Sequence, residues 1–182
     1  MAGGTALALQ IGHRVSLDFD FYTEKRFDAE KLRQKLRKEF QDVTLLQKAE
    51  DTLIVKIRNV AVSFFRYSYP LVFPPIAAVN GVYLASKQDI AAMKVIAISD
   101  RGAKRDFIDI YFLLKEFSFE EIFKFVKKKY PQFNIYVALR GLTYFADAEK
   151  AQRRRLYLFS SISWNEIKKF LVGEVKKFQK NA

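Results

Sequence analysis

The first quarter of the chain combines a helical pattern with a strand pattern. Residues 3–12 follow a Gly-Gly turn and end at Gly12, which predicts a short helix. Residues 15–22 are rich in large apolar side chains and predict a strand. Asp28 is a suitable N-cap for a helix that reaches about Phe40. The apolar residues of that helix recur at helical spacing: Ala29, Leu32, Leu36 and Phe40.

The next stretch, "TLIVKIRNVAVSFFRY", is rich in Val, Ile and Phe and predicts two strands joined at Arg58-Asn59. The segment "YPLVFPP" ends this hairpin, because Pro70, Pro74 and Pro75 cannot continue a ladder of backbone hydrogen bonds. A hairpin beside the earlier strand predicts a small sheet in the first half of the chain.

The second half is helical in pattern. Three pairs of residues have the spacing of capping boxes and predict helix starts: Ser86 with Asp89, Ser118 with Glu121, and Ser163 with Glu166. The predicted helices span about 86–99, 105–117, 118–130, 134–147 and 163–180. The expected fold class is therefore α+β, with a mixed α/β core over residues 1–83 and a C-terminal helical bundle over residues 84–182.

The net charge and the composition restrict the classes of function and of binding partner that the protein can have. The formal net charge of +12 favours polyanionic partners such as nucleic acid or nucleotides, although a solvated basic surface is the alternative. There is no cysteine, which excludes disulfides and fits a reducing compartment. No apolar run is long enough for a membrane span, and the start has no basic leader, so we expect a cytoplasmic protein without a membrane contact.

Two carboxylates interrupt the apolar run "SLDFDFYT". Asp18 and Asp20 are two positions apart, so they share one face of the predicted strand, and Phe19 and Phe21 are expected to point the other way into the core. Adjacent carboxylates repel unless a cation lies between them, which predicts a Mg²⁺ site, with Mn²⁺ as the alternative ion. The competing interpretation is that one Asp caps the turn and the other pairs with Arg14 or Lys25 of this chain.

The Gly-Gly turn before the first predicted helix favours the metal site over the interpretation as a cap and an ion pair. Gly3 and Gly4 let the backbone approach a phosphate closely, and the helix that follows presents free N–H groups. Thr5 is grouped with them, and Ser16 shares the face of the aspartates if the strand is regular. A Gly-Gly turn, a short helix and a strand with Asp-x-Asp together have the layout of a nucleotidyltransferase fold.

A second set of charges lies in "DIAAMKVIAISDRGAKRDFIDIYFLL". Lys94 and Arg101 share one helix face, and Asp106 and Asp109 share a face of the next helix. The two cations would neutralise charge on a triphosphate, and an aspartate would orient the lysine or act as a base. The alternative is a set of ordinary ion pairs between the helices.

These two stretches together resemble the AbiEii/AbiGii-type nucleotidyltransferases, the toxins of abortive-infection, type IV toxin–antitoxin systems. The resemblance covers residues 3 to about 117. It implies a glycine turn at Gly3 and Gly4, a metal site at Asp18 and Asp20, and a second catalytic group at these positions: Lys94, Asp106 and Asp109, with the substrate contact Arg101 between them. It also implies transfer of a nucleotide from an NTP, with Mg²⁺, to an RNA (such as tRNA) or a protein, and a cognate antitoxin.

The chain departs from the wider nucleotidyltransferase pattern in two places. Ser63 stands where many of these enzymes carry a third carboxylate. Relatives also have a helix and a strand before the Gly-Gly turn, whereas only Met1 and Ala2 precede it here, which leaves open a truncated start and a missing sheet edge.

Two other functions remain open at this stage. One is a non-catalytic nucleic-acid-binding module, for which the basic runs with aromatics at 124–130 and 152–157 would cradle RNA. The other is a degenerate relative that binds a nucleotide and transfers nothing. The aligned aspartates favour the enzyme over the pure binder, because without a metal they would repel phosphate.

Overall fold

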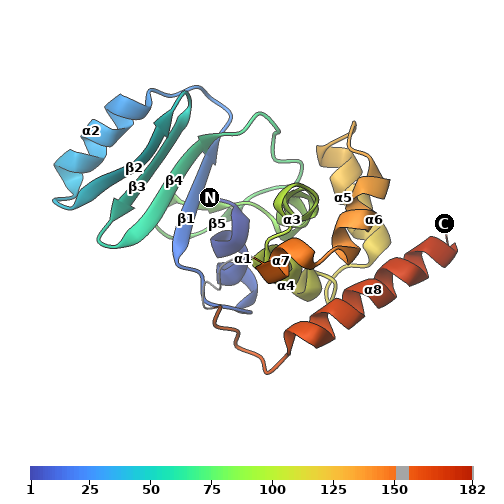
Figure 1. The fold of residues 1–182 in the computed structure, drawn as a ribbon. Coiled ribbons are helices and arrows are strands. Elements are labelled where there is room, and N and C mark those ends of the chain that lie inside the picture. Colours follow the sequence, from blue (N-terminus) through green and yellow to red (C-terminus); the bar gives the residue numbers. More distant parts are fainter. Residues whose placement is uncertain (151–155, 182) are drawn as a thin grey trace.

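The computed structural model describes residues 1–150 and 156–181, and these form a mixed α+β fold (Figure 1). A small sheet occupies one end and most helices the other. The sheet has the order β1-β4-β3-β2, with β1 parallel to β4 and the other neighbours antiparallel. Its strands are β1 (Asp18–Thr23), β2 (Val43–Ala49), β3 (Thr52–Ile57) and β4 (Val60–Arg66).

The predicted hairpin is confirmed at its turn. Arg58 and Asn59, between β3 and β4, both have positive φ angles of 46° and 68°. Two consecutive residues of this kind match the right-handed twist of paired strands, which is why such turns close tight hairpins. The edge strand β2 was not predicted from the sequence, because its segment "VTLLQKA" lacks alternation and most of its residues are exposed.

Helix α2 (Ala29–Glu39) packs on one face of the sheet and forms a small core with β3 around Leu53 and Val55. Asp28 caps it by accepting hydrogen bonds from two backbone N–H groups, as predicted. The prediction that Phe19 points into the core is wrong, since its side chain is 38% exposed. The reason is that α2 covers β2 and β3 and leaves this end of β1 uncovered.

The larger core joins α1 (Gly3–Ile11) to the helical half. Gly12 closes α1 as predicted, with φ of 60° and its N–H donated to Ala8 O. All three predicted helix starts are confirmed by hydrogen bonds between each serine and its partner three residues on. The helices are α3 (Lys87–Arg101), α4 (Lys104–Leu113), α5 (Phe119–Lys129), α6 (Ile135–Thr143), α7 (Ala146–Lys150) and α8 (Trp164–Asn181).

The first two residues connect the sheet to a second, two-stranded sheet. Ala2 N–H donates to Asp20 O on the outer edge of β1, and Met1 exchanges backbone hydrogen bonds with Tyr83 and Ala85. Tyr83 belongs to the second sheet, which consists of β5 (Ile76–Ala77) and β6 (Tyr83–Leu84), with the 3-10 turn η1 (Val79–Gly81) between them. The edge of β1 that the sequence left open is therefore covered in part by this segment. The division of the chain at residues 83 and 84 stays a prediction.

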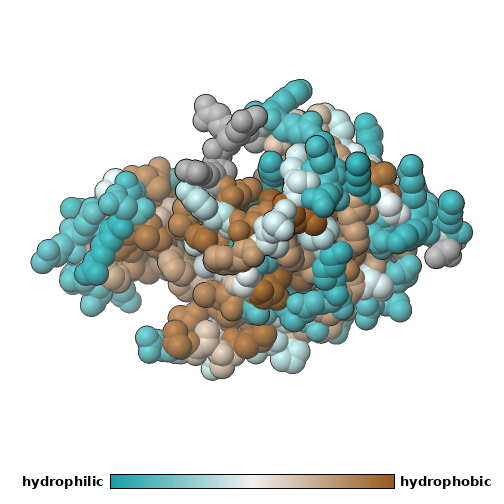
Figure 2. Space-filling model, turned by 90° about the horizontal axis from the view of Figure 1, so that it is seen from below, coloured by the Kyte–Doolittle hydropathy of each residue, from teal (hydrophilic) through white to brown (hydrophobic). Residues whose placement is uncertain are grey.

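Hydrophilic residues cover the α2 end and the opposite helical end of the molecule, with hydrophobic residues between them (Figure 2). Within the described ranges, none of the helices is long and apolar enough to cross a bilayer. Part of the basic run at 152–157 falls at 152–155 and lies outside the described residues. The other run, 124–130, falls on α5, where Lys124, Lys127 and Lys128 are exposed but Lys129 is buried against Asp89 at 2.7 Å.

Candidate active site

A large cavity of about 1240 Å³ lies between the sheet and the helical half. Its lining comes from the start of α1 and the loop that follows it, the face of β1 and β4, the C-terminal part of α3, the start of α4, and α7. The segment from Leu156 to the beginning of α8 completes it. Most of the residues singled out in the sequence are among those that line it: Gly3, Gly4, Thr5, Ser16, Asp18, Asp20, Lys94 and Arg101.

The Gly-Gly turn lies directly against the aspartates. A β-carbon on Gly3 would lie 3.1 Å from Oδ2 of Asp20, and one on Gly4 would collide with the guanidinium of Arg14. The Thr5 hydroxyl donates to Ser16 Oγ at 2.7 Å and also contacts the backbone oxygen of Asp18. These bonds fix the first turn of α1 beside β1, so the N-terminus of the helix faces the same space as the carboxylates.

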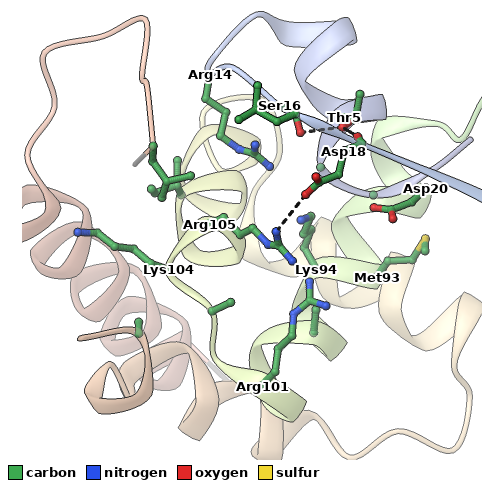
Figure 3. Close-up of a pocket in the computed structure, with 18 of the residues that line it drawn as sticks. Thr5, Arg14, Ser16, Asp18, Asp20, Met93, Lys94, Arg101, Lys104 and Arg105 are labelled. Atoms are coloured by element: carbon green, nitrogen blue, oxygen red, sulfur yellow. Dashed lines mark hydrogen bonds and ion pairs between the residues drawn. The ribbon is translucent and has the colours of Figure 1, made fainter. Parts of the chain in front are cut away.

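Asp18 and Asp20 project into the cavity from one face of β1, as predicted (Figure 3). Asp20 lies opposite Ser63 in the register of β1 with β4. Burial raises the pKa of Asp20, and the nearby charge of Asp18 adds to this, while the hydrogen bond with Ser63 and the charge of Arg105 oppose it. The site therefore favours a positive charge between the two carboxylates.

Cationic side chains form the opposite wall of the cavity. Arg101 and Arg105 point toward the aspartates in Figure 3, and Nη1 of Arg105 lies 3.8 Å from Oδ2 of Asp18. Lys94 is buried, and its Nζ lies 2.7 Å from Oδ1 of Asp106 and 2.5 Å from Oδ2 of Asp109. This wall can bind the phosphates of a substrate beside the carboxylates.

Asp106 and Asp109 are both fully buried, and neither lines the cavity. Asp106 accepts hydrogen bonds from Arg101 at 2.9 and 3.1 Å, and Asp109 accepts two from Arg14 at 2.7 and 3.0 Å. Burial opposes their ionisation, yet the surrounding cations hold the pKa of each carboxyl below its usual range. Of the two roles that the sequence left open, this geometry fits orientation of the lysine, because a fully paired carboxylate of low pKa is a weak base.

Arg14, Arg105 and His13 were not predicted as site residues. Arg14 was considered only as an ion-pair partner of Asp18 or Asp20, but it binds Asp109 instead. His13 lies with Arg14 on the same carboxylate, since its Nε2 is 2.7 Å from Oδ1 of Asp109. Arg105 had a signal in the sequence, since it directly precedes the first aspartate of "RDFID" and so had to lie near the same helix junction.

The residues present fit a divalent cation only with help from a substrate. Among residues 1–150 and 156–181, no group of three or more His, Cys, Asp or Glu side chains is arranged to hold a metal. Asp18 and Asp20 supply two carboxylates on one face, and the residue opposite Asp20 on β4 is Ser63 and not an acid. Mg²⁺ typically binds to one or two carboxylates together with water and substrate phosphates, so this donor set is suitable for it.

The small mixed sheet, the glycine turn and the paired aspartates are consistent with a nucleotidyltransferase-like fold. The family model described as "Nucleotidyl transferase AbiEii toxin, Type IV TA system" matches residues 1–81 and 67–180. The chain therefore belongs to this family of nucleotidyltransferase toxins, in agreement with the resemblance noted in its sequence. It is also 38% identical to an uncharacterized protein of Aquifex aeolicus (strain VF5), over 100% of this chain and 88% of that relative.

Variants of two glycines, Gly3 and Gly12, can distinguish the effect of backbone strain from damage to the active site. Gly3 and Gly12 both have positive φ angles, of 77° and 60°, but a β-carbon on Gly12 would meet no atom within 4 Å. We expect Gly3→Ala and Gly12→Ala to lower the melting temperature by similar amounts, since both force an L-residue into the left-handed region. Only Gly3→Ala should also reduce nucleotide transfer, because its new methyl group displaces Asp20. Equal activity of the two variants would contradict a role for this turn.

Proposed function

We propose that this protein transfers a nucleotide from an NTP to an RNA or protein acceptor in a reaction that depends on Mg²⁺. The observation that carries the proposal is the placement of Asp18 and Asp20 beside Gly3, facing the cations Arg101 and Arg105 across one cavity. A site for phosphate binding alone would have no use for two carboxylates on that face, because they repel phosphate unless a cation is bound.

In the proposed reaction the oxygen of an acceptor hydroxyl bonds to the α-phosphorus of the NTP and the proton of that hydroxyl passes to water. The bond between the α-phosphorus and the bridging oxygen of the β-phosphate breaks, and pyrophosphate leaves. Asp18 and Asp20 would hold Mg²⁺, or Mn²⁺, whose chemistry is to neutralise phosphate oxygens. The glycine turn and the α1 N-terminus would bind the triphosphate through backbone N–H groups. Lys94, Arg101 and Arg105 would stabilise charge on the transferred group and on the leaving pyrophosphate.

The family and the proposed substrates also indicate a partner protein and a cellular location for this protein. A type IV toxin–antitoxin system implies a cognate antitoxin, and we propose that one restrains this protein. NTPs and RNA are cytoplasmic molecules, so the proposal places the reaction in the cytoplasm. Expression of the protein without its antitoxin is expected to slow growth.

The direct test is incubation with each of the four NTPs, labelled at the α-phosphate, together with Mg²⁺ and total tRNA. RNA and protein are then separated and inspected for label. We expect label on one of them with at least one NTP, and none when EDTA removes the metal. Absence of label with all four NTPs would contradict the transferase and favour a degenerate relative that only binds nucleotide.

Lys94 provides a separate test of the cationic wall. We expect Lys94→Met to reduce transfer by about 10²–10³-fold, the usual effect of removing one preorganised charge-stabilising group. The variant should still fold, with reduced stability, because both carboxylates lose Lys94 while Asp106 keeps Arg101 and Asp109 keeps Arg14 and His13 as partners. The measurement is kcat at saturating NTP with circular dichroism as the folding control. Near-normal kcat would eliminate the proposed role of Lys94.

A further inference from the structure

Helix α8 begins with residues that line the cavity. It then runs along the outside of the helical half (Figure 1). Trp164 and Ile167, in its first turn, line the cavity. One side of the helix packs into the main core through Ile167, Leu171 and Val175, all of which are buried. The residues of the opposite side are exposed near the start and the end of the helix and partly buried between them.

The solvent side of α8 is strongly basic. Lys169, Lys176 and Lys180 are exposed and recur at spacings that place them on one helical face. Lys169 and Lys180 are 11 residues apart, so this row extends over about 16 Å. A shallow groove runs along the same face, and its lining consists of Lys168, Lys169, Val172, Gly173 and Lys176.

The acidic residues of α8 compensate the charge of this row only at its first lysine. Glu174 pairs with Lys177 at 2.6 Å, and helical spacing places both to one side of the row. Glu166 lies in the first turn, where its carboxylate accepts the backbone N–H of Ser163 as part of the helix cap and also interacts with the charge of Lys169. The charge of Lys169 is therefore balanced in part by this exposed carboxylate, while Lys176 lies beyond its reach on the same face.

Gly173 lies in the middle of this face, and no contact with the described residues explains why a glycine is present there. Glycine in a helix interior is destabilising relative to alanine. A β-carbon at Gly173 would meet no atom of the described residues within 4 Å, so the packing seen in residues 1–150 and 156–181 does not require a glycine there. A bare backbone between lysines does allow the backbone of another molecule to approach the helix closely.

One ion pair links the lining of the groove to the lining of the active-site cavity. Nζ of Lys168, which lines the groove, lies 2.6 Å from Oε1 of Glu149, which lines the cavity. This partly exposed ion pair places the start of the groove beside α7 at the rim of the cavity. A polymer bound along α8 would have its end directed toward Trp164 and, beyond it, toward the aspartates.

We propose that the lysine face of α8 around Gly173 binds the phosphate backbone of an RNA acceptor and guides its end into the cavity. This inference rests on the proposed function, in which a nucleotide is added to an acceptor at Asp18 and Asp20. A row of lysines with only Val172 as an apolar contact suits evenly spaced phosphates better than a protein surface, which would need apolar contacts as well.

The first test measures binding without chemistry. A fluorescent RNA hairpin with a single-stranded 3′ end is titrated by anisotropy at several salt concentrations. We expect Lys169→Gln with Lys176→Gln to weaken binding by about tenfold or more and to reduce the slope of log K against log[salt] by about one unit per lysine. The matched control is Lys35→Gln with Lys38→Gln on α2, where both lysines are exposed at the other end of the molecule. Equal effects of the two double variants would overturn the inference.

Gly173→Gln tests the close approach. Because glutamine favours a helix more than glycine, we expect an equal or higher melting temperature, together with weaker RNA binding. A purely structural role of Gly173 would change the melting temperature and leave RNA binding as it is in the wild type. That result would contradict the approach of RNA to this face.

Kinetics separate this inference from the proposed function. In the α8 lysine variant we expect a raised KM for RNA, with kcat and the KM for NTP unchanged. If the wild type labels only protein and binds no RNA, the inference fails while the transferase stands. If no NTP supports transfer but RNA binding still depends on Lys169 and Lys176, the proposed function fails and the α8 site stands.

Discussion

Replacement of Asp18 and Asp20 together by Asn is expected to abolish nucleotide transfer. Asparagine keeps the size of each side chain but removes the charged ligands of the metal. RNA association should persist or tighten, because two negative charges near a polyanion are gone, and it should still weaken steeply with salt. Transfer is measured with α-labelled NTP, and RNA association is measured by anisotropy.

The matched control removes two negative charges elsewhere. Asp42 and Asp147 are exposed, so Asp42→Asn with Asp147→Asn should keep full transfer activity. If expression of the wild type slows growth, the double variant at Asp18 and Asp20 should not. A double variant as toxic as the wild type would mean that the harm comes from sequestration of RNA, and the binding-module interpretation would replace the enzyme.

The second large effect concerns stability. Asp109 is fully buried and contacts three groups, Lys94, Arg14 and His13. Asp109→Asn removes the carboxylate charge and leaves Lys94 and Arg14 buried with less compensation, which typically lowers the free energy of unfolding by about 3–5 kcal/mol. The measurement is urea unfolding at pH 7. The control is Glu50→Gln, whose exposed pair with Arg26 should contribute little.

The same variant has a defined pH dependence. Because the folded state depresses the pKa of Asp109, its charge stabilises the fold above the unfolded pKa of about 3.9, and this contribution is lost as the pH falls toward the folded value. The difference in stability between the wild type and Asp109→Asn should therefore be full at pH 7 and shrink below about pH 4. A difference that stays constant from pH 7 to pH 3 would show that the charge of Asp109 is not the cause.

Much of the fold could be predicted from local patterns in the sequence. The serine capping boxes and Gly12 depend on neighbours within four residues, so the chain alone was enough to predict those helix ends. Strand β2 was missed because its exposed residues show no alternation, and only the pairing with β3 defines it. Phe19 was misjudged for a related reason, since the extent of α2 over the sheet is a tertiary property.

In the candidate site, too, the local features could be predicted from the sequence and the tertiary contacts could not. The alignment of Asp18 with Asp20 follows from strand geometry, and the shared faces of Lys94 with Arg101 and of Asp106 with Asp109 follow from helical spacing. The sequence did not predict that Arg14 would bind Asp109, because the two residues are 95 positions apart and meet only when α1 packs on α4. The roles of all these residues in transfer stay predictions until the variants are measured.

The most direct test of the central claim compares one NTP labelled at the α-phosphate with the same NTP labelled at the γ-phosphate. Each is incubated with the wild-type protein, Mg²⁺ and RNA, and the acceptor is isolated. Nucleotidyl transfer predicts label on the acceptor from the α-labelled NTP only, with the γ label recovered in pyrophosphate. Label on the acceptor from the γ-labelled NTP would show phosphoryl transfer instead, and no label from either would show that the site at Asp18 and Asp20 transfers nothing.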